Sequence, residues 1–346
     1  MRIERVRPLG DTPSVVSVVV PCYNYGHYLP DAVGSVLSQG VPVEIIIVDD
    51  CSTDDSAEVA SELAEQHPQV RLVRNERNLG HIATFNRGLA MVTGEYVVLL
   101  SADDMLAPGS LRRAVSLFER NPSVGLVYGH PQLFTDELPQ PWNTGTCIIW
   151  RGSKWLGIIA RRGENLMFSP EAILRASLMR KLGEYDPRAP QTSDMLIWMR
   201  AARHADIGRV NGVQAFYRTH PDQMHSTLFA GVRTDMSARA DLFQQFFGPG
   251  GEGSGDPSAS LRLRRALRAI ANEATRHATL AIRPDDQSEA AGYAHFASTV
   301  DTGITGTWRW RRYERLLRRR KPGITTYLSC RLRWKLKFWT WRALGV

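Results

Sequence analysis

The chain has 346 residues, of which 43% are apolar and 23% charged, and it carries a formal net charge of +8. This is the composition of a globular protein with a core, and it excludes a disordered or fibrous chain. Residues 301–346 hold thirteen Lys and Arg against two acids, so the basicity belongs to the C-terminal tail and the body is nearly neutral. The length predicts one large domain with an appendage, or two domains.

Cysteine usage and the absence of long apolar runs indicate where the protein works. Cys22, Cys51, Cys147 and Cys330 are scattered without a C-x-x-C pair, which favours neither a zinc site nor a disulfide framework. We therefore expect a reducing, cytoplasmic location. The N-terminus lacks the apolar core of a signal peptide, and no uncharged apolar run approaches the roughly 18 residues that span a bilayer. Peripheral attachment at the inner face of the cell membrane is compatible with this pattern.

Apolar, β-prone runs alternate with segments of helical periodicity over the first 130 residues. Strands are predicted at 15–20, 43–48, 70–73, 96–100 and 124–128, and helices at 29–38, 53–66, 82–91 and 110–120. This alternation is typical of a doubly wound α/β fold with a mostly parallel sheet. Residues 131–165 are predicted to be rich in loops, and Ser169 is predicted to open a helix-like stretch. A further helix is predicted at 195–204 and a further strand at 208–217.

Three of the predicted strands end in polar residues. The first runs into Pro21-Cys22-Tyr23-Asn24, the second into Asp49-Asp50 and the fourth into Asp103-Asp104. In a parallel sheet these ends face one crevice. Adjacent carboxylates with hard oxygen ligands suit Mg²⁺ or Mn²⁺, whereas the alternative is a pair of solvated acids at the start of the next helix. Neither G-x-G-x-x-G nor a P-loop motif is present, which disfavours a dinucleotide fold and a P-loop NTPase.

A pocket of this kind could hold a nucleoside between an aromatic ring and a carboxylate. The segments 18–24, 46–54 and 94–104 together resemble those of the inverting glycosyltransferases of family 2, which have the GT-A fold. The resemblance covers residues 14–130 in order and spacing and continues more weakly to about residue 225. It implies an enzyme that transfers a sugar from a nucleotide-diphosphate sugar to an acceptor hydroxyl.

The resemblance also implies which residues hold the nucleotide. Pro21, Tyr23, Asn24 and Asp50 are expected to bind the base of the nucleotide-sugar. Gly80 falls in the Asn-x-Gly loop of the family, which shapes the same pocket. The donor stays open among UDP-, dTDP- and GDP-sugars, and the acceptor among a glycan, a lipid and a small molecule.

The remaining family positions are those of the metal and the catalytic base. Asp103 is expected near the ribose and Asp104 on Mg²⁺ or Mn²⁺, although Ser101 stands where many members carry an Asp. Asp194 matches the general base of the family, and its alternative role is to cap the helix that follows. His220, in the segment Tyr-Arg-x-His, is expected to reach the metal or the diphosphate, whereas a single His is otherwise often structural.

The basic tail at 301–346 interleaves Arg and Lys with Trp and Leu. This pattern suits an anionic membrane surface. The alternatives are packing on the catalytic domain and contact with a second subunit in a homo-oligomer. No nucleic-acid-binding module is recognisable, so we expect no nucleic acid partner.

The predicted organisation is a GT-A catalytic domain at 1–235, with a nucleotide-sugar-binding half at 14–130 and an acceptor-side half at 131–235. A helical region at 236–346 follows, with a flexible Gly-rich linker at 248–258. Two other functions stay open. A non-catalytic nucleotide-sugar-binding or scaffold protein is supported by Ser101 and Ser193, which replace family acids. A nucleotidyltransferase would need a basic, Gly-rich loop after the first strand, and residues 21–26 contain no basic Lys or Arg.

Overall fold

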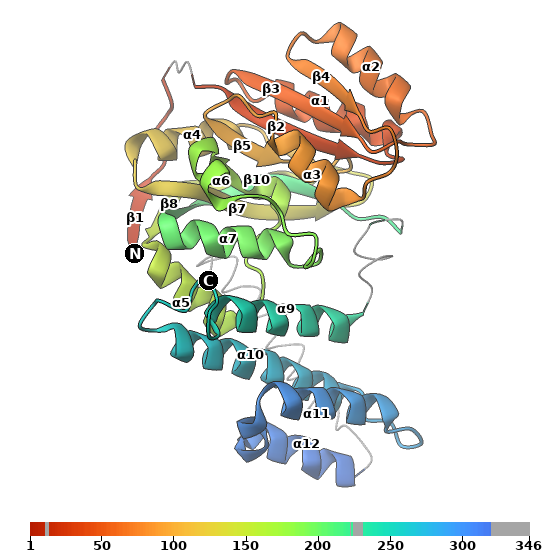
Figure 1. Cartoon of the computed structure of the whole chain (residues 1–346), viewed down its shortest axis with the longest axis vertical. Coiled ribbons are helices and arrows are strands. Elements are labelled where there is room, and N and C mark those ends of the chain that lie inside the picture. Colours follow the sequence, from red (N-terminus) through yellow and green to blue (C-terminus); the bar gives the residue numbers. More distant parts are fainter. Residues whose placement is uncertain (11–13, 222, 224–230, 320–346) are drawn as a thin grey trace. The chain divides into compact units, whose positions relative to one another are not determined.

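The computed structural model describes residues 1–10, 14–221, 223 and 231–319, to which all structural statements refer (Figure 1). This chain forms two compact units. The first comprises Met1–Trp155 and Met167–Gln223, and the second comprises Leu156–Leu166 and the chain from Met224 onward. The first unit ends at Gln223, whereas the predicted domain boundary is at residue 235, and Leu156–Leu166 from the middle of the chain belongs to the second unit.

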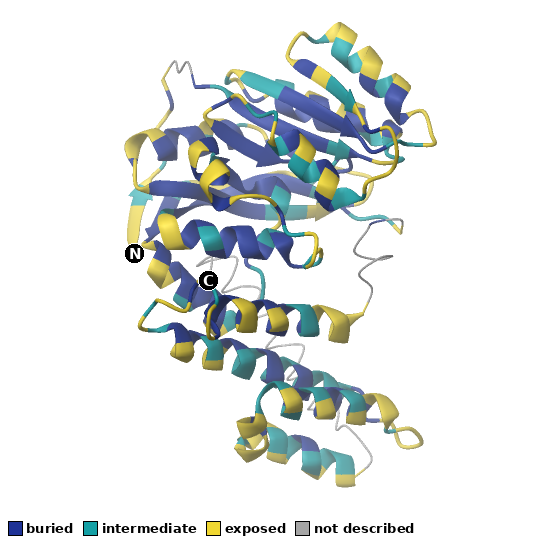
Figure 2. Cartoon of the chain, in the orientation of Figure 1, coloured by how far each residue is buried: buried dark blue, intermediate teal, exposed yellow. Residues whose placement is uncertain are grey.

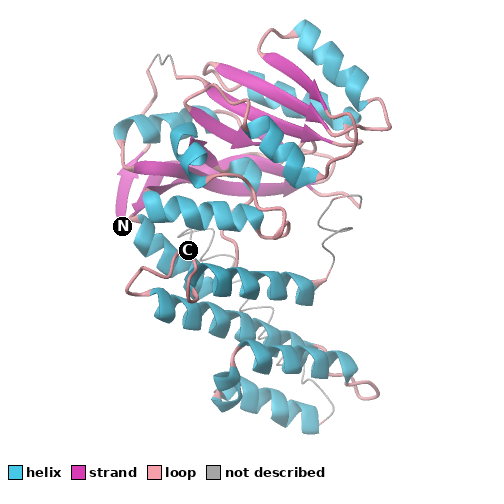
Figure 3. Ribbon diagram, viewed as in Figure 1, coloured by secondary structure: helices cyan, strands magenta, loops and turns pink. Residues whose placement is uncertain are grey.

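The first unit is built on a ten-stranded sheet, drawn in magenta in Figure 3. Its strands are β1 (Arg2–Arg5), β2 (Val16–Cys22), β3 (Val43–Asp49), β4 (Val70–Arg74), β5 (Tyr96–Leu99), β6 (Met105–Leu106), β7 (Val124–Phe134), β8 (Asn143–Trp150), β9 (Ile173–Arg175) and β10 (Asp206–Arg218). The strand order is β1-β8-β10-β7-β9-β5-β2-β3-β4, and β6 pairs with β10.

Most of the long strands of this sheet run in one direction. β2 is parallel to β3 and β5, and β3 is parallel to β4. Since β9 is antiparallel to both β5 and β7, these two strands point the same way, and β10 is parallel to β7. The C-terminal ends of β2, β3, β5 and β10 therefore meet at one edge of the sheet, which is where open α/β sheets bind ligands.

Helices cover both faces of the sheet, so the predicted α/β class with a mostly parallel, doubly wound sheet is confirmed (Figure 3). They are α1 (Leu29–Leu37), α2 (Ser56–Gln66), α3 (His81–Leu89), α4 (Ser110–Arg120), α6 (Ala176–Leu182) and α7 (Ser193–His204). Val18 and Val20 share a core cluster with residues of α1 and α4, and the central strands of the sheet are drawn as buried in Figure 2. Val19 faces α3, where a Cβ on Gly88 would lie only 2.3 Å from the Val19 Cγ1. Glycine is therefore required for this close approach of helix and sheet.

The acceptor-side half is more regular than predicted. Residues 131–165 contain β8 and α5 (Gly152–Arg162) in addition to loops. Both elements carry a glycine that looks like a loop signal: Gly145 has a φ of +69°, and a Cβ on Gly152 would lie 1.9 Å from the carbonyl oxygen of Ala202. The stretch opened by Ser169 is a single 3₁₀ turn, Ser169–Glu171, which leads into β9 and α6 rather than into one helix.

The second unit is helical. Besides the later part of α5, it contains α9 (Val232–Phe247), α10 (Ala259–Leu280), α11 (Ser288–Val300) and α12 (Trp308–Arg318). α10 packs against α9, α11 and α12. The buried Arg239 pairs with Asp235 and Glu273 and donates to the carbonyl oxygen of Gly163, which ties the end of α5 into this unit.

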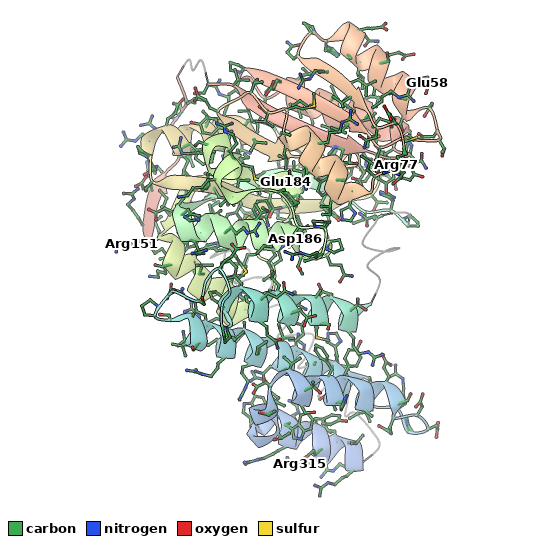
Figure 4. The ribbon with its side chains drawn as sticks, in the orientation of Figure 1. Glu58, Arg77, Arg151, Glu184, Asp186 and Arg315 are labelled. Atoms are coloured by element: carbon green, nitrogen blue, oxygen red, sulfur yellow. The ribbon has the colours of Figure 1, made fainter. Side chains whose placement is uncertain are left out.

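Two segments next to these helices were predicted from the sequence, the linker at 248–258 and the basic tail at 301–346. Residues 248–258, predicted as a linker, form hydrogen-bonded turns in which the Gly253 amide donates to the carbonyl oxygen of Phe246 (2.8 Å). Of the basic tail, residues 320–346 lie outside the described residues, and α12 with its labelled side chain Arg315 is the described part (Figure 4). None of the helices in the described chain is long and apolar enough to cross a membrane.

Candidate active site

The loop after β2 is fastened to the loop after β3. Asn24 adopts a φ of +58°, its backbone amide donates to the Ser52 hydroxyl (2.9 Å), and its side-chain oxygen accepts from the Thr53 amide (2.8 Å). Asn tolerates this left-handed conformation better than most residues. The adjacent Tyr23 keeps 44% of its surface exposed, so its ring is accessible to a ligand.

Asp50 and Gly80, predicted on the nucleotide site, are in direct contact. The buried carboxylate of Asp50 accepts hydrogen bonds from the Asn75 side-chain amide (2.6 Å), the Leu79 amide (2.8 Å) and the Gly80 amide (2.9 Å). Gly80 can close this loop because it adopts a φ of +80°. A carboxylate offers about four acceptor positions, so Asp50 holds the loop and keeps capacity for one further donor.

The two carboxylates after β5 are buried at the end of β10. Asp104 is 1% and Asp103 8% exposed. Burial and the like charge of Asp103 hold the pKa of Asp104 well above its usual range. A bound cation would favour the ionised form of Asp104 and would offset both effects. The pair is therefore chemically suited to a divalent metal. Within the described ranges, no cluster of three or more His, Cys, Asp or Glu residues is arranged to hold a metal ion.

Arg218 ties the carboxylate pair to α1. Its backbone amide donates to the Asp104 Oδ1 (3.0 Å) and its Nε to the carbonyl oxygen of Asp103 (2.9 Å). Its Nη2 donates to the Asp31 carboxylate (2.8 Å). The guanidinium carbon lies 4.5 Å from the ring centre of Tyr28 and equally far from that of Phe134. Arg218 therefore positions the loop that carries Asp103 and Asp104.

His220 lies beside Asp103. The distance between its Nε2 and the Asp103 Oδ2 is 3.1 Å, and its ring centre lies 5.4 Å from those of Tyr25 and Tyr28. The predicted partners Asp103, Asp104 and His220 are thus brought together, with the imidazole on Asp103 and not on Asp104.

Asp194 lies in the first turn of α7. Its Oδ1 accepts from the Met195 amide (2.6 Å), as a residue at a helix start does. Burial raises the pKa of Tyr217, and the negative charges of Asp104, Asp103 and Asp194 raise it further. The predicted metal acids, from the segment 14–130, and the predicted base, from the segment 131–235, therefore both raise the pKa of this one phenol.

The loop before α7 is fixed by Asn86 of α3. The side-chain oxygen of Asn86 accepts from the Tyr185 amide (2.8 Å), and its side-chain nitrogen donates to the Tyr185 carbonyl (3.0 Å). Figure 4 labels Glu184 and Asp186 on this loop, and Asp186 pairs with Arg188 (2.8 Å). These two hydrogen bonds link α3 to the loop that leads into α7, the helix that carries Asp194.

Three residues near these acids had no role assigned from the sequence. Phe168 packs against Tyr217, with ring centres 5.0 Å apart, and Glu171 is fully buried next to them. Tyr217 appeared only as a letter of the Tyr-Arg-x-His segment. The one signal available beforehand was the pairing of Ser169-Pro170 with Glu171, which is typical of a helix start.

Comparison with known proteins points to one family. Residues 17–181 match the model of Glycosyl transferase family 2. An uncharacterized glycosyltransferase of Nostoc sp. is 42% identical over 114 residues, which cover 33% of this chain and 35% of that relative. The chain thus matches about a third of the length of this curated relative.

Two solved structures share the fold. TarS 1–349 of S. aureus, in complex with UDP-GlcNAc, superposes with a TM-score of 0.57 at 17% identity, over 88% of this chain and 91% of the other. The mannosyltransferase PcManGT of Pyrobaculum calidifontis, in complex with GDP-Man and Mn²⁺, gives a TM-score of 0.50 at 19% identity, over 90% and 86%. The predicted GT-A fold and the resemblance noted in the sequence are confirmed, and residues 17–181 belong to glycosyltransferase family 2.

Proposed function

We propose that this protein is an inverting glycosyltransferase that moves a sugar from a nucleotide-diphosphate sugar to an acceptor hydroxyl. The observation that carries the proposal is that β3 and β5, the strands that precede Asp50 and the pair Asp103-Asp104, are both parallel to β2 and end at one edge of the sheet. Tyr217 supports it, because the charges of Asp103, Asp104 and Asp194 all act on this one phenol.

The nucleotide is proposed to bind between the loops after β2 and β3. Tyr23 offers an exposed ring for the base, and Asp50 offers its remaining acceptor position to a base N–H group. Pro21 and Asn24 shape the first loop and Gly80 the wall opposite. Because TarS binds UDP-GlcNAc and PcManGT binds GDP-Man, we expect the donor among UDP-, dTDP- and GDP-sugars.

Asp104 is proposed to hold a divalent metal, with Asp103 toward the ribose and His220 at the metal or the diphosphate. The support for such an ion is that Asp103 and Asp104 are both buried, that a cation would offset the raised pKa of Asp104, and that the His220 Nε2 lies 3.1 Å from the Asp103 Oδ2. A bound Mg²⁺ or Mn²⁺ would stabilise the negative charge of the departing diphosphate as a Lewis acid. The Mn²⁺ in the PcManGT structure is consistent with this choice.

Asp194 is proposed as the general base. The acceptor oxygen forms a bond to the anomeric carbon, the bond from that carbon to the diphosphate oxygen breaks, and the acceptor proton passes to the Asp194 carboxylate. Attack from the face opposite the nucleotide inverts the anomeric carbon. General-base catalysis of this kind contributes about 10² to 10⁴ in rate.

A cytoplasmic location and a peripheral contact with an anionic membrane are part of the proposal. The described support is α12, in which Arg311, Arg315 and Arg318 are exposed, as is Trp308 before them. Exposed Arg and Trp suit the headgroup region of an anionic bilayer. A homo-oligomer contact is the alternative use of this surface.

The proposal is tested by donor turnover with purified protein, Mn²⁺ and a panel of UDP-, dTDP- and GDP-sugars. Release of the nucleoside diphosphate is expected with one class of donor, and both Asp104→Ala and Asp194→Ala should abolish it. The matched control is Asp206→Asn, at the opposite end of β10. Nucleotide binding without turnover on any donor would indicate a binding protein instead and would refute the proposal.

A further inference from the structure

Tyr28 lies between the nucleotide loop and the proposed metal site. It ends the 3₁₀ turn Gly26–Tyr28, which leads from the loop after β2 into α1. Its ring centre lies 5.4 Å from that of His220, and the guanidinium carbon of Arg218 lies 4.5 Å from the same ring centre. Tyr28 therefore contacts two of the side chains that bear on the acids after β5.

The backbone before Tyr28 is anchored to the chain around the start of α2. The Tyr25 amide donates a hydrogen bond to the Ser56 hydroxyl (3.1 Å), and the Gly26 amide donates to the Asp54 Oδ2 (3.4 Å). The exposed tyrosine ring proposed for the base precedes these two anchors by two and three residues. The segment therefore offers one ring to the nucleotide and carries Tyr28, at its other end, on a fixed backbone.

Two rings of this anchored segment lie against the His220 imidazole. Tyr25 meets it edge-on, with ring centres 5.4 Å apart, and Tyr28 meets it with the planes inclined by 46°. The two tyrosine rings lie 5.7 Å from each other, and aromatic pairs at such separations attract one another. The side chain of His220 is only 10% exposed. The two rings therefore limit the orientations in which its Nε2 can face Asp103.

Tyr28 also lies under the Arg218 guanidinium. The ring face attracts this cation, as does the ring of Phe134, which lies equally close at 4.5 Å. The same guanidinium donates to the carbonyl oxygen of Asp103 (2.9 Å) and pairs with Asp31 at the start of α1 (2.8 Å). Loss of the Tyr28 ring would therefore loosen Arg218 and, through it, the loop that carries the acids.

We propose that Tyr28 is a positioning residue of the metal site, which holds His220 and Arg218 in place around the cation. This inference rests on the proposed glycosyltransferase function and its metal. The alternative is that Tyr28 only packs α1 against the end of β10. Groups that orient the ligands of a metal commonly change its affinity by about 10- to 100-fold. The affinity for the cation therefore depends on Tyr28, whereas the affinity for a nucleoside without metal does not.

The test compares cation binding with nucleoside binding in the full chain. Binding of Mn²⁺ is read from the electron paramagnetic resonance signal of the free ion, alone and with UDP, dTDP or GDP, against samples of nucleotide without protein. Binding of uridine, thymidine and guanosine in EDTA is measured by calorimetry. Thermal unfolding of every protein records the loss of packing.

The variants separate the aromatic ring of Tyr28 from its volume. Tyr28→Leu removes the ring, Tyr28→Met removes it with a more adaptable side chain in case the first variant does not fold, and Tyr28→Phe retains it. The matched control is Tyr293→Leu in the second unit. Tyr293 likewise lies beside an arginine, Arg233 (5.6 Å), and a histidine ring, His277 (5.3 Å).

The Kd for Mn²⁺ with the nucleoside diphosphate should rise by about ten-fold or more in Tyr28→Leu and Tyr28→Met. The Kd for the free nucleoside should stay within about two-fold of that of the unaltered protein. Tyr28→Phe should keep the Mn²⁺ Kd within about three-fold, because the ring face is retained. Tyr293→Leu should change neither constant.

Other outcomes separate the role of Tyr28 from the enzyme. An unchanged Mn²⁺ Kd in Tyr28→Leu or Tyr28→Met overturns the inference and leaves the proposed function standing. Equal losses of Mn²⁺ and nucleoside binding, or a Tyr28→Phe variant as weak as Tyr28→Leu, also overturn it, since Tyr28 would then be only structural. Absence of Mn²⁺ binding in the unaltered protein overturns it too, and absence of donor turnover in addition refutes the proposed function.

Discussion

Replacing Asp104 by Asn is expected to stabilise the protein without metal and to abolish its stabilisation by a divalent cation. The amide oxygen can still accept from the Arg218 amide, which is the one hydrogen bond of the Asp104 side chain within the described part of the chain. In the unaltered protein, burial and the negative charge of Asp103 both raise the pKa of Asp104. Asn carries no charge, so the substitution removes the cost of ionising a buried group and the repulsion between the two carboxylates. The substitution is therefore expected to have opposite signs for stability and for function.

The two effects can be given magnitudes. Removing a buried, incompletely paired carboxylate charge is worth about 1–3 kcal/mol. A metal at about 100 times its Kd adds about 2.7 kcal/mol to the unfolding free energy of a protein that binds it. That gain corresponds to about 5–10 °C in Tm for a domain of roughly 200 residues. The unaltered protein should show the second effect, and Asp104→Asn should show the first.

Thermal unfolding is measured for both proteins in EDTA, in Mn²⁺, and in Mn²⁺ with UDP, with Asp206→Asn as the control. In EDTA the advantage of Asp104→Asn should grow as the pH rises above about 4. The reason is that a carboxyl with a raised folded-state pKa loses stability once the unfolded chain can ionise and the folded one cannot freely do so. A Mn²⁺-dependent shift of equal size in Asp104→Asn, or none in the unaltered protein even with UDP, would refute the reasoning.

Three further outcomes are expected. Asp194→Asn should lower kcat by about 10² to 10⁴ while calorimetry gives an unchanged Kd for UDP, and a loss below ten-fold would exclude Asp194 as the base. Burial raises the pKa of Glu171, so the unfolding free energy of the unaltered protein should fall as the pH rises from about 5 to 8. In urea unfolding, Glu171→Gln should become more stable relative to the unaltered protein across that range. A difference in unfolding free energy that does not change with pH would contradict this. Asn86→Ala loses two hydrogen bonds to Tyr185 and should reduce the unfolding free energy by about 1–3 kcal/mol, with faster amide exchange at Tyr185; a change below about 0.5 kcal/mol would show that the loop is held by other contacts.

The nucleotide side of the fold was predictable because its strands are buried on both faces. Such strands are continuous apolar runs in the sequence, and β2, β3 and β5 begin and end within one or two residues of their predicted bounds. Their C-terminal ends could be assigned to one edge of the sheet, because the C-terminal ends of parallel strands lie at the same edge. The contacts of Asp50 were not predictable, because its three donors come from a loop 25 to 30 residues further along the chain.

The acceptor side was harder for a physical reason. β8 and α5 contain glycines at positions of positive φ or close approach, and these resemble loop signals unless the neighbouring chain is known. The contact between Phe168 and Tyr217 joins residues far apart in sequence, from a 3₁₀ turn and a strand. No periodicity within either segment announces it. Local patterns therefore predicted the helices and strands, whereas the contact between Phe168 and Tyr217 depends on tertiary structure.

The position of β10 has a consequence for how the protein acquires its site during synthesis. Among the described strands β10 is made last, yet it is inserted between β7 and β8. The gap between those strands must stay open until residues 206–218 leave the ribosome, and such non-local pairing folds slowly. Arg218 and His220 are synthesised at or just after the end of β10. In every shorter nascent chain, Asp103 and Asp104 therefore lack their contacts with Arg218 and His220. A fragment limited to the matched segment 17–181 would expose two unpaired strand edges, which are prone to aggregation. A fragment expressed to obtain the complete sheet with its acids therefore needs to extend beyond His220.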